Sequence, residues 1–366
     1  MMQPIRNQRL RRKTVLRKNP KRGLGAELCA ALLAACCLAS CGDTSPREQV
    51  VVYVSVDEHV AKPILQEFED RTGIDVLMVG DTEARKTTGL VERLRAERDH
   101  PVADVFWSSE AMQTIDLAED GVLARCEQPE LVDWPKSWRD SNWRWFGFSP
   151  RPRVIAYNPD RTPAGDVPAT WEAATDPRWK NRIVLADPRF GTTGGHLGVM
   201  ATLWPERYGE FLRGLQSNEA RMLPGGNAAV VDAIVHGEAG IGFTDADDVR
   251  AAQRRGLPVA MVYPWHEPGT AGGGTFMMPN TVAIVSGGPN PAAGRQLLMA
   301  LLSDETARAL AASVSGNVPL QPGVASEFPE LRIEEPLEID LTEAATGRAS
   351  AIERAMSMLR PGSASP

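Results

Sequence analysis

Short runs of apolar residues alternate along this chain with stretches in which apolar positions recur every three or four residues. The run VVVYVSV (50–56) predicts a buried parallel strand, because strands covered on both faces are apolar throughout. The next stretch places Ile64, Leu65 and Phe68 on one helical face, and Gly73 marks its end. Strand-like and helix-like segments then alternate as far as DLAEDG (116–121). This alternation predicts a doubly wound α/β lobe, whose ligands would bind beyond the carboxyl ends of its strands.

The pattern changes between about 131 and 158, where four tryptophans crowd together before the extended stretch GFSPRPRVIAYNP. A second α/β stretch runs from about 168 to 262, and TFMMPNTVAIVS then predicts a strand that crosses back. We therefore expect two doubly wound α/β lobes joined by two crossing strands, a hinged clamp. Lobe 1 would comprise 50–145 and 275–322, and lobe 2 would comprise 155–262. Residues 323–366 form a C-terminal segment that the pattern assigns to neither lobe.

The N-terminal region predicts export. Nine basic residues within 6–22 precede an apolar run of about 15 residues, which suits a signal peptide and is shorter than a membrane-spanning helix. LASC (38–41) resembles a bacterial lipobox, in which Cys41 is lipidated and becomes the new N-terminus. The alternative is an ordinary signal peptide that is cut nearby and leaves Cys41 as an incidental thiol. We expect a signal peptide over 1–40 and a flexible tether over 41–49.

Removal of this signal changes the electrostatics of the chain. The remaining sequence carries 31 basic and 46 acidic side chains, a net charge of −15. Such a surface argues against nucleic acid, which needs a basic footprint, and against electrostatic docking on anionic lipid. With Cys41 lipidated, only Cys126 keeps a thiol, so we expect no disulfide within the chain and assign Cys126 no role.

Several segments together resemble a known family. These are VVVYVSVDEHVAKPILQEFEDRTGIDV, PVADVFWSSEAM, PATWEAATDPRWKNRIVLADP, VHGEAGIGFTDADD and the run from MPNTVAIVSGGPNP to 312. In this order and spacing they are similar to periplasmic solute-binding proteins of ABC importers, in the ferric-iron-binding branch, over about 50–322. The resemblance implies a type II periplasmic binding (Venus flytrap) fold and no catalysis. It also implies delivery of cargo to a membrane permease and its ATPase. Together with the lipobox-like LASC, we expect a monomer in the periplasm or at the cell surface, anchored to the membrane by lipid such as palmitate on Cys41.

The same resemblance implies a metal site. In ferric-binding members two adjacent tyrosines after a second-lobe strand hold the metal, and the matching positions here are Asp247 and Asp248. Neighbouring carboxylates in TDADD are suitable ligands for a hard cation such as Fe³⁺. The alternative is that Asp245 or Asp247 simply caps the next helix.

The first lobe offers further candidate ligands. Asp57 follows the first strand and Glu110 follows the third, where family members place an acid or histidine and a glutamate. An acid in a first helical turn also complements the helix dipole, which is the alternative for Glu110. His59 is displaced from the matching position, and we expect a solvated histidine without a ligand role.

A glycine-rich turn predicts an anion site. In DPRFGTTGGHLG (187–198) a strand ends and a helix begins, so backbone N–H groups at Thr192, Thr193, Gly194 and Gly195 would face an anion. Asn227 matches a second anion-contacting position of the family. The resemblance implies a synergistic anion beside iron, or phosphate in relatives with phosphorylated ligands. The alternative is a tight turn with a threonine cap.

Three functions compete. The first is carriage of ferric iron, or a similar metal, with an anion. The second is the same class of protein carrying a small phosphorylated or phosphonate solute. The third is an extracytoplasmic enzyme, which the sequence disfavours because it has no G-x-S-x-G elbow, P-loop or H-E-x-x-H motif. We expect no catalytic residue and no catalytic cofactor. Residues 263–267 (YPWHE) recross the hinge, and we expect them to pack rather than to bind ligand.

Overall fold

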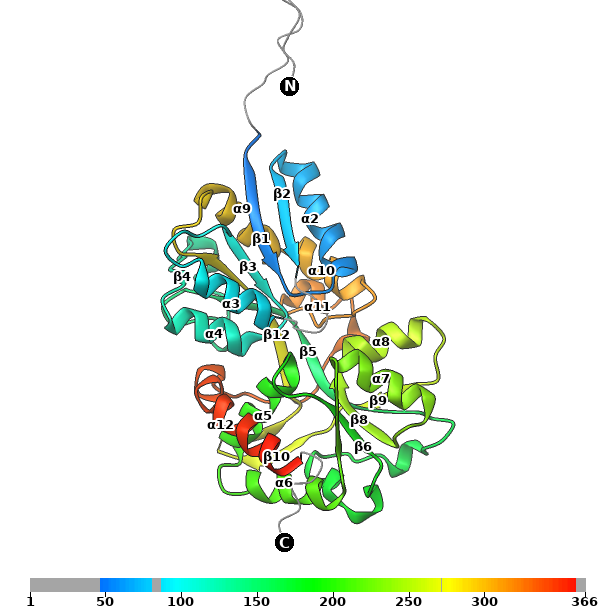
Figure 1. Cartoon of the computed structure of the whole chain (residues 1–366). Helices are drawn as coiled ribbons and strands as arrows, with labels where there is room; N and C mark the ends of the chain where they lie inside the picture. Colours follow the sequence, from blue (N-terminus) through cyan, green and yellow to red (C-terminus); the bar gives the residue numbers. More distant parts are fainter. Residues whose placement is uncertain (1–46, 81–86, 271, 360–366) are drawn as a thin grey trace, which may run out of the picture. The chain divides into compact units, whose positions relative to one another are not determined.

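The computed structural model describes residues 47–80, 87–270 and 272–359 (Figure 1). The predicted signal peptide and Cys41 lie outside the described residues. Strand β1 (Gln49–Val54) begins at the end of the predicted tether, and the Glu48 carbonyl already accepts a hydrogen bond from the Asp75 N–H at 2.9 Å. Among the described residues, no helix combines the length and the hydropathy that a bilayer crossing requires.

Lobe 1 is built on three parallel strands. β2 (Asp75–Gly80) and β3 (Val105–Ser108) flank β1. Alternate residues of β1 face opposite sides, so Val51 and Tyr53 join one hydrophobic cluster while Val50 and Val52 join another. Helices cover both faces: α2 (Glu58–Thr72), α3 (Thr88–Ala96), α4 (Ala111–Glu119), α9 (Pro291–Leu301) and α10 (Asp304–Ala312). Gly73 ends α2 in the left-handed conformation, as the sequence predicts.

Lobe 2 repeats this plan. Its strands β6 (Ile183–Ala186), β7 (Arg221–Leu223) and β8 (Ile241–Asp245) are parallel, and β9 (Ala260–Val262) pairs with the crossing strand β5. Its helices are α5 (Thr192–Leu203), α6 (Tyr208–Ser217), α7 (Asn227–His236) and α8 (Ala246–Arg254). Figure 1 shows α7 and α8 on one side of β8, with α5 and α6 towards the other.

The two crossing strands pair with each other. β5 (Phe146–Tyr157) is antiparallel to β12 (Met277–Val285), which makes one sheet of order β2-β1-β3-β12-β5-β8-β6-β7. β5 pairs with β12 through residues 146–152 and with β8 through residues 153–156. The predicted α/β fold of two lobes joined by two crossing strands is therefore confirmed, with the addition that a single sheet runs through both lobes.

The C-terminal segment crosses between the lobes. Helix α11 (Pro322–Ala325) contacts α10 of lobe 1, and α12 (Leu341–Leu359) packs mainly on α5, and also on α6 of lobe 2 and α4 of lobe 1. Figure 1 shows α12, in red, beside α5. The remaining short elements are β4 (Leu123–Ala124), β10 (His266–Gly269), β11 (Gly272–Gly274) and 3₁₀ turns at 129–131, 136–138, 164–166, 172–175, 177–179 and 329–331.

Candidate ligand-binding cleft

A cavity of about 60 Å³ lies where strands of both lobes end. The residues that directly follow β1 and β3, Ser55 and Ser109, line it from lobe 1, and the last residues of β6 and β8 line it from lobe 2. This is the position that a doubly wound fold predicts for a ligand. Its polar lining also includes Asp57, Arg151, Thr192, Asn227, Asp245, Asp247, Asp248, Asn280, Ser315 and Asn317.

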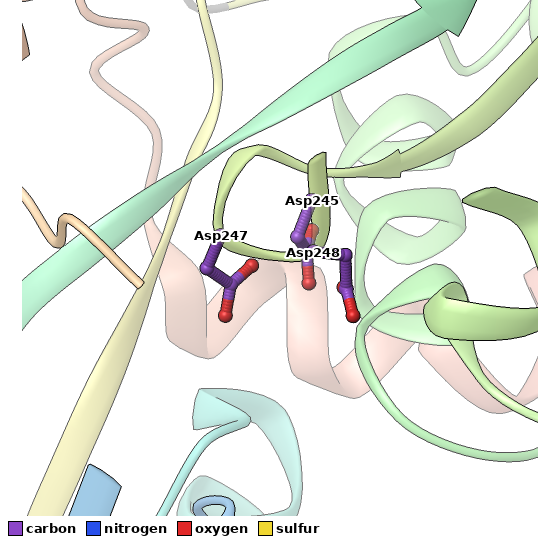
Figure 2. A group of neighbouring side chains, drawn as sticks. All are labelled: Asp245, Asp247 and Asp248. Carbon is purple, nitrogen blue, oxygen red and sulfur yellow. The ribbon is translucent and has the colours of Figure 1, made fainter. Parts of the chain in front are cut away.

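Three aspartates form the acidic part of this lining. Asp245 is the last residue of β8, and Asp247 and Asp248 occupy the first turn of α8. One carboxylate oxygen from each lies within 4.8 Å of the others, and the three groups point to the same side of the turn (Figure 2). Asp245 occupies the cap position of α8, yet its side chain makes no capping hydrogen bond. The capping alternative therefore fails for Asp245.

The carboxylate of Asp245 is held by other side chains. Arg153 Nη1 donates to Oδ1 at 2.8 Å, while Thr192 Oγ1 and Asn227 Nδ2 donate to Oδ2 at 2.7 and 2.9 Å. Burial alone would raise the pKa of Asp245, but the guanidinium groups of Arg153 and Arg151 hold it below its usual value. Asp245 is therefore a buried, ionised carboxylate at the base of the cleft.

Two arginines that no sequence motif singles out also stand at this cleft. Arg151 and Arg153 stand on β5 where this strand passes from β12 to β8, and they are 5% and 0% exposed. Arg151 Nε lies 3.0 Å from Asp247 Oδ2, and Arg151 Nη2 lies 3.7 Å from Asp245 Oδ2. The available signal was the pair of charged residues, two positions apart, in a strand that is otherwise apolar or small.

The predicted anion residues divide into two groups. Thr192 and Asn227 line the cavity, at the first turns of α5 and α7. Thr193, Gly194 and Gly195 do not line it. A Cβ atom at Gly194 would lie 2.2 Å from the Pro188 carbonyl oxygen, and one at Gly195 would lie 2.6 Å from Glu110 Oε1. These two glycines therefore permit close packing, which the glycine-rich sequence alone does not distinguish from an anion-binding turn.

Of the two predicted metal ligands of lobe 1, only one lines the cavity. Asp57 lines the cavity. Glu110 is fully buried outside the cavity lining, where its carboxylate accepts hydrogen bonds from the N–H groups of Met112 and Gln113 at 3.0 and 2.8 Å. Burial raises the pKa of Glu110. The structure thus places Glu110 at the start of α4, where the alternative expected an acid that complements the helix dipole, and shows in addition that its side chain caps this helix. His59 is exposed and does not line the cavity.

Among the described residues, no tyrosine, tryptophan, histidine, cysteine or methionine lines this cavity, and its aromatic lining residue is Phe190. None of the four tyrosines of the chain, at positions 53, 157, 208 and 263, lines the cavity. Trp265, His266 and Glu267 do not line it either, and His266 is buried against His196 with 2.8 Å between their Nε2 atoms. Cys126 is a buried free thiol. The cleft therefore offers carboxylate, hydroxyl, amide and guanidinium groups.

Comparisons with known proteins agree with this architecture. Residues 64–332 match the model of the bacterial extracellular solute-binding protein family. Iron uptake protein A1 of Synechocystis is 26% identical over 316 residues, which cover 79% of this chain and 84% of that protein. Apo ferric ion-binding protein A of Pasteurella haemolytica has a TM-score of 0.74 at 23% identity, covering 85% of this chain and 98% of that chain. AfuA of Actinobacillus pleuropneumoniae with bound fructose-6-phosphate has a TM-score of 0.70 at 19% identity, covering 86% and 99%. The chain belongs to the bacterial extracellular solute-binding protein family.

Proposed function

We propose that this chain is the substrate-binding subunit of an ABC importer, and that its cleft carries ferric iron, or a similar oxygen-liganded metal, with a small anion. The observation that carries this proposal is the cluster of Asp245, Asp247 and Asp248 at the cavity (Figure 2). Hard multivalent cations prefer such oxygen ligands. The name of the relative from Synechocystis, an iron uptake protein, supports the same cargo. The chain would bind and deliver this cargo without catalysing a reaction.

The charge of the cleft favours a cation over a phosphorylated solute. Four carboxylates, those of Asp57, Asp245, Asp247 and Asp248, line the cavity together with Arg151, while Arg153 pairs with Asp245 from outside the lining. These six side chains carry a formal charge of −2. A multivalent cation neutralises this excess, whereas a phosphate ester would increase it in a region of low dielectric constant. The free volume of about 60 Å³ also suits an ion with a few waters or a small anion. Sites for organic ligands usually measure about 300–1,000 Å³.

The anion would lie at the two helix starts beside the carboxylates. Thr192 and Asn227 are the first residues of α5 and α7, and both line the cavity. Helix N-termini carry partial positive charge and unpaired N–H groups, so they favour a small anion. We place the anion there and the metal at the aspartates. Thr192 and Asn227, rather than Gly194 and Gly195, would then be the residues closest to the anion.

Metal analysis of protein purified without chelator tests this assignment. We expect bound iron, and we expect ferric citrate to raise the melting temperature. At a hundredfold excess over Kd, a ligand of the folded state adds about 2.7 kcal/mol to the free energy of unfolding. Since no tyrosine lines the cavity, the iron-loaded protein should lack the visible phenolate-to-iron charge-transfer band.

Matched variants locate the metal. Asp247→Asn and Asp248→Asn should each weaken ferric binding at least tenfold. Asp304→Asn should not, because this exposed aspartate occupies the first turn of α10, outside the cavity. If fructose 6-phosphate or aminoethylphosphonate stabilises the protein and no metal does, the cargo is a phosphorylated or phosphonate solute and not a metal.

We further propose that lipid on Cys41 anchors the protein to the outer face of a membrane, where it would meet the permease and ATPase. The lipobox-like LASC at 38–41 supports this. The Cys41→Ser precursor should remain uncleaved at this site and unlabelled by a palmitate analogue, while Cys126→Ser should be processed and labelled normally. Labelling that persists in Cys41→Ser would refute the anchor.

A further inference from the structure

Arg151 connects the two lobes inside the cleft. Its Nη2 donates to the Ser109 carbonyl of lobe 1 at 2.7 Å, and its Nε lies 3.0 Å from the Asp247 carboxylate of lobe 2. Burial disfavours the charged guanidinium, but the carboxylates of Asp247, Asp245, Asp248 and Asp57 together raise the pKa of Arg151. A permanent positive charge therefore lies among the four carboxylates to which we assign the cargo cation.

The contacts of Arg151 with the aspartates are electrostatic rather than well-aligned hydrogen bonds. The Nε of Arg151 is buried and has no hydrogen-bond partner, although Asp247 Oδ2 is only 3.0 Å away, because the oxygen lies off the N–H direction. Nη1 reaches Asn280 Oδ1 only at 3.5 Å. The Ser109 carbonyl therefore holds the guanidinium by a hydrogen bond, whereas the aspartates hold it by charge, and a stronger competing charge can displace it from the aspartates.

Asn317 supplies an independent indication that a ligand enters here. This residue is 3% exposed and lines the cavity, and its side-chain amide donates to the Ser149 carbonyl at 2.9 Å. The Oδ1 atom has no hydrogen-bond partner. A buried acceptor without a donor costs about 1–3 kcal/mol. A donor on the ligand, such as a water bound to a metal ion, would satisfy it.

We propose that Arg151 is a tethered counter-cation, which offsets the charge of Asp247 beside the Arg153–Asp245 pair and which cargo must displace. This inference rests on the proposed function, and it adds a rule of selection. A monovalent ammonium ion brings no more charge than the guanidinium that it would replace, so the exchange yields little Coulomb energy. For a divalent or trivalent ion, the attraction to the carboxylates increases in proportion to the charge of the ion, because Coulomb energy scales with the product of the charges. Arg151 therefore restricts the cargo to multivalent cations.

Arg151→Gln tests this rule. The variant removes the guanidinium that offsets Asp247 and leaves the Arg153–Asp245 pair in place, so it should be less stable without metal and should bind metal more tightly. We expect the Kd values for Ca²⁺ and for Fe³⁺ supplied as citrate to fall at least tenfold in calorimetric titrations. We also expect ethylammonium to raise the melting temperature of Arg151→Gln but not that of the wild type.

Arg144→Gln is the matched control. Arg144 pairs with the buried Asp140, Nε to Oδ2, at 2.7 Å in lobe 1, and neither residue lines the cavity. This variant should lose stability while its metal affinity stays unchanged. Arg151→Lys keeps the positive charge and should keep the selectivity for multivalent ions.

A measurement on the wild type covers the case in which Arg151→Gln does not fold. The Nε–H resonance of Arg151, assigned by its absence in Arg151→Lys, should shift when the diamagnetic ion Ga³⁺ saturates the site. An unchanged resonance, or metal binding that is equal or weaker in Arg151→Gln, would overturn the role of Arg151 and leave the metal cargo standing. If no metal binds the wild type or the variants, the proposed cargo is wrong and the inference on Arg151 falls with it.

Discussion

Arg153 shows how a single buried charge organises one side of the cleft. Its Nη1 donates to Asp245, Thr192 and Asn227, whereas its Nε and Nη2 are buried without hydrogen-bond partners. Breaking a buried ion pair by removing one partner typically costs about 3–5 kcal/mol, because the other charge stays uncompensated. The Arg153–Asp245 pair thus fixes the positions of Thr192 and Asn227, the two side chains that line the cavity at the starts of α5 and α7.

A pair of neutral histidines lies behind this network. The Nδ1 atom of His266 lies 3.0 Å from the Gly274 carbonyl, to which it donates, so its Nε2 accepts a hydrogen bond from His196 at 2.8 Å. Protonation of His266 would place two N–H groups against each other. Burial, together with the charge of Arg153, lowers the pKa of His266 to about 3 and that of His196 well below its ordinary value.

This pair predicts a loss of stability in acid. Unfolded histidine has a pKa of about 6.5, so the unfolded chain binds protons that the folded chain excludes. Stability is fully present above pH 6.5, and it is lost as the pH falls towards the folded pKa. In urea unfolding between pH 7 and pH 4, His266→Gln should reduce this loss by up to about 1.4 kcal/mol per pH unit. The exposed His59→Gln serves as control and should follow the wild type. If the free energy of unfolding falls equally with pH in His266→Gln and in the wild type, the prediction is wrong.

Helix α5 carries the cleft at its N-terminus and packs against α12 along its length. A Cβ atom at Gly194 would lie 2.8 Å from Ile352 Cδ1, and one at Gly198 would lie 2.8 Å from the Ala344 carbonyl oxygen. The absence of side chains at these positions lets the two helices approach closely. The glycines that suggest an anion turn in the sequence therefore serve the contact between α5 and its neighbours.

Gly194→Ala separates these two roles. The added methyl group would meet the Pro188 carbonyl oxygen at 2.2 Å, and overpacking of this kind costs about 1–3 kcal/mol. We expect urea unfolding to show this loss, with ferric binding changed less than threefold. Gly347→Ala on α12 is the control: only Thr202 Oγ1, at 3.7 Å, is near, so alanine should stabilise the helix by about 0.5–1 kcal/mol. Unchanged stability with lost binding would restore the anion role.

The elements that the sequence predicts well are those whose signals are local. The valine-rich run of β1 and Gly73 at the end of α2 act through neighbouring residues, so the α/β alternation follows from the chain itself. The ion pair of Arg153 and Asp245 is different. These residues are 92 positions apart and meet because they lie opposite each other in the β5–β8 register, which no local pattern encodes. Asp245, Asp247 and Asp248, by contrast, could be recognised from the sequence as a possible metal site, because these three aspartates lie within four consecutive positions.

The C-terminal helix α12 links the lobes outside the cleft. It packs on α5 and α6 of lobe 2, where the Tyr208 hydroxyl donates to the Ala351 carbonyl at 2.9 Å. Its Arg348 forms an ion pair with Asp116 of α4, in lobe 1, and the two side chains are 17% and 30% exposed. The helical pattern of this segment could not reveal its lobe, because its apolar face contacts elements of both. Opening of the cleft by rotation of the lobes would act on the Arg348–Asp116 contact.

Charge exchange at this pair tests the link. Asp116→Arg places two guanidinium groups together, and we expect it to lower the free energy of unfolding by about 1–2 kcal/mol, since the pair is partly screened by solvent. The double variant Asp116→Arg, Arg348→Asp should recover most of this loss, because the attraction is restored with the two charges exchanged.

If the pair holds the lobes together, small-angle scattering of the cargo-free protein should give a larger radius of gyration for Asp116→Arg and a wild-type radius for the double variant. Arg213→Glu, which breaks the exposed pair with Glu210 within lobe 2, should leave the radius unchanged. A destabilised Asp116→Arg with the wild-type radius would limit the pair to local packing and leave β5 and β12 to set the angle between the lobes.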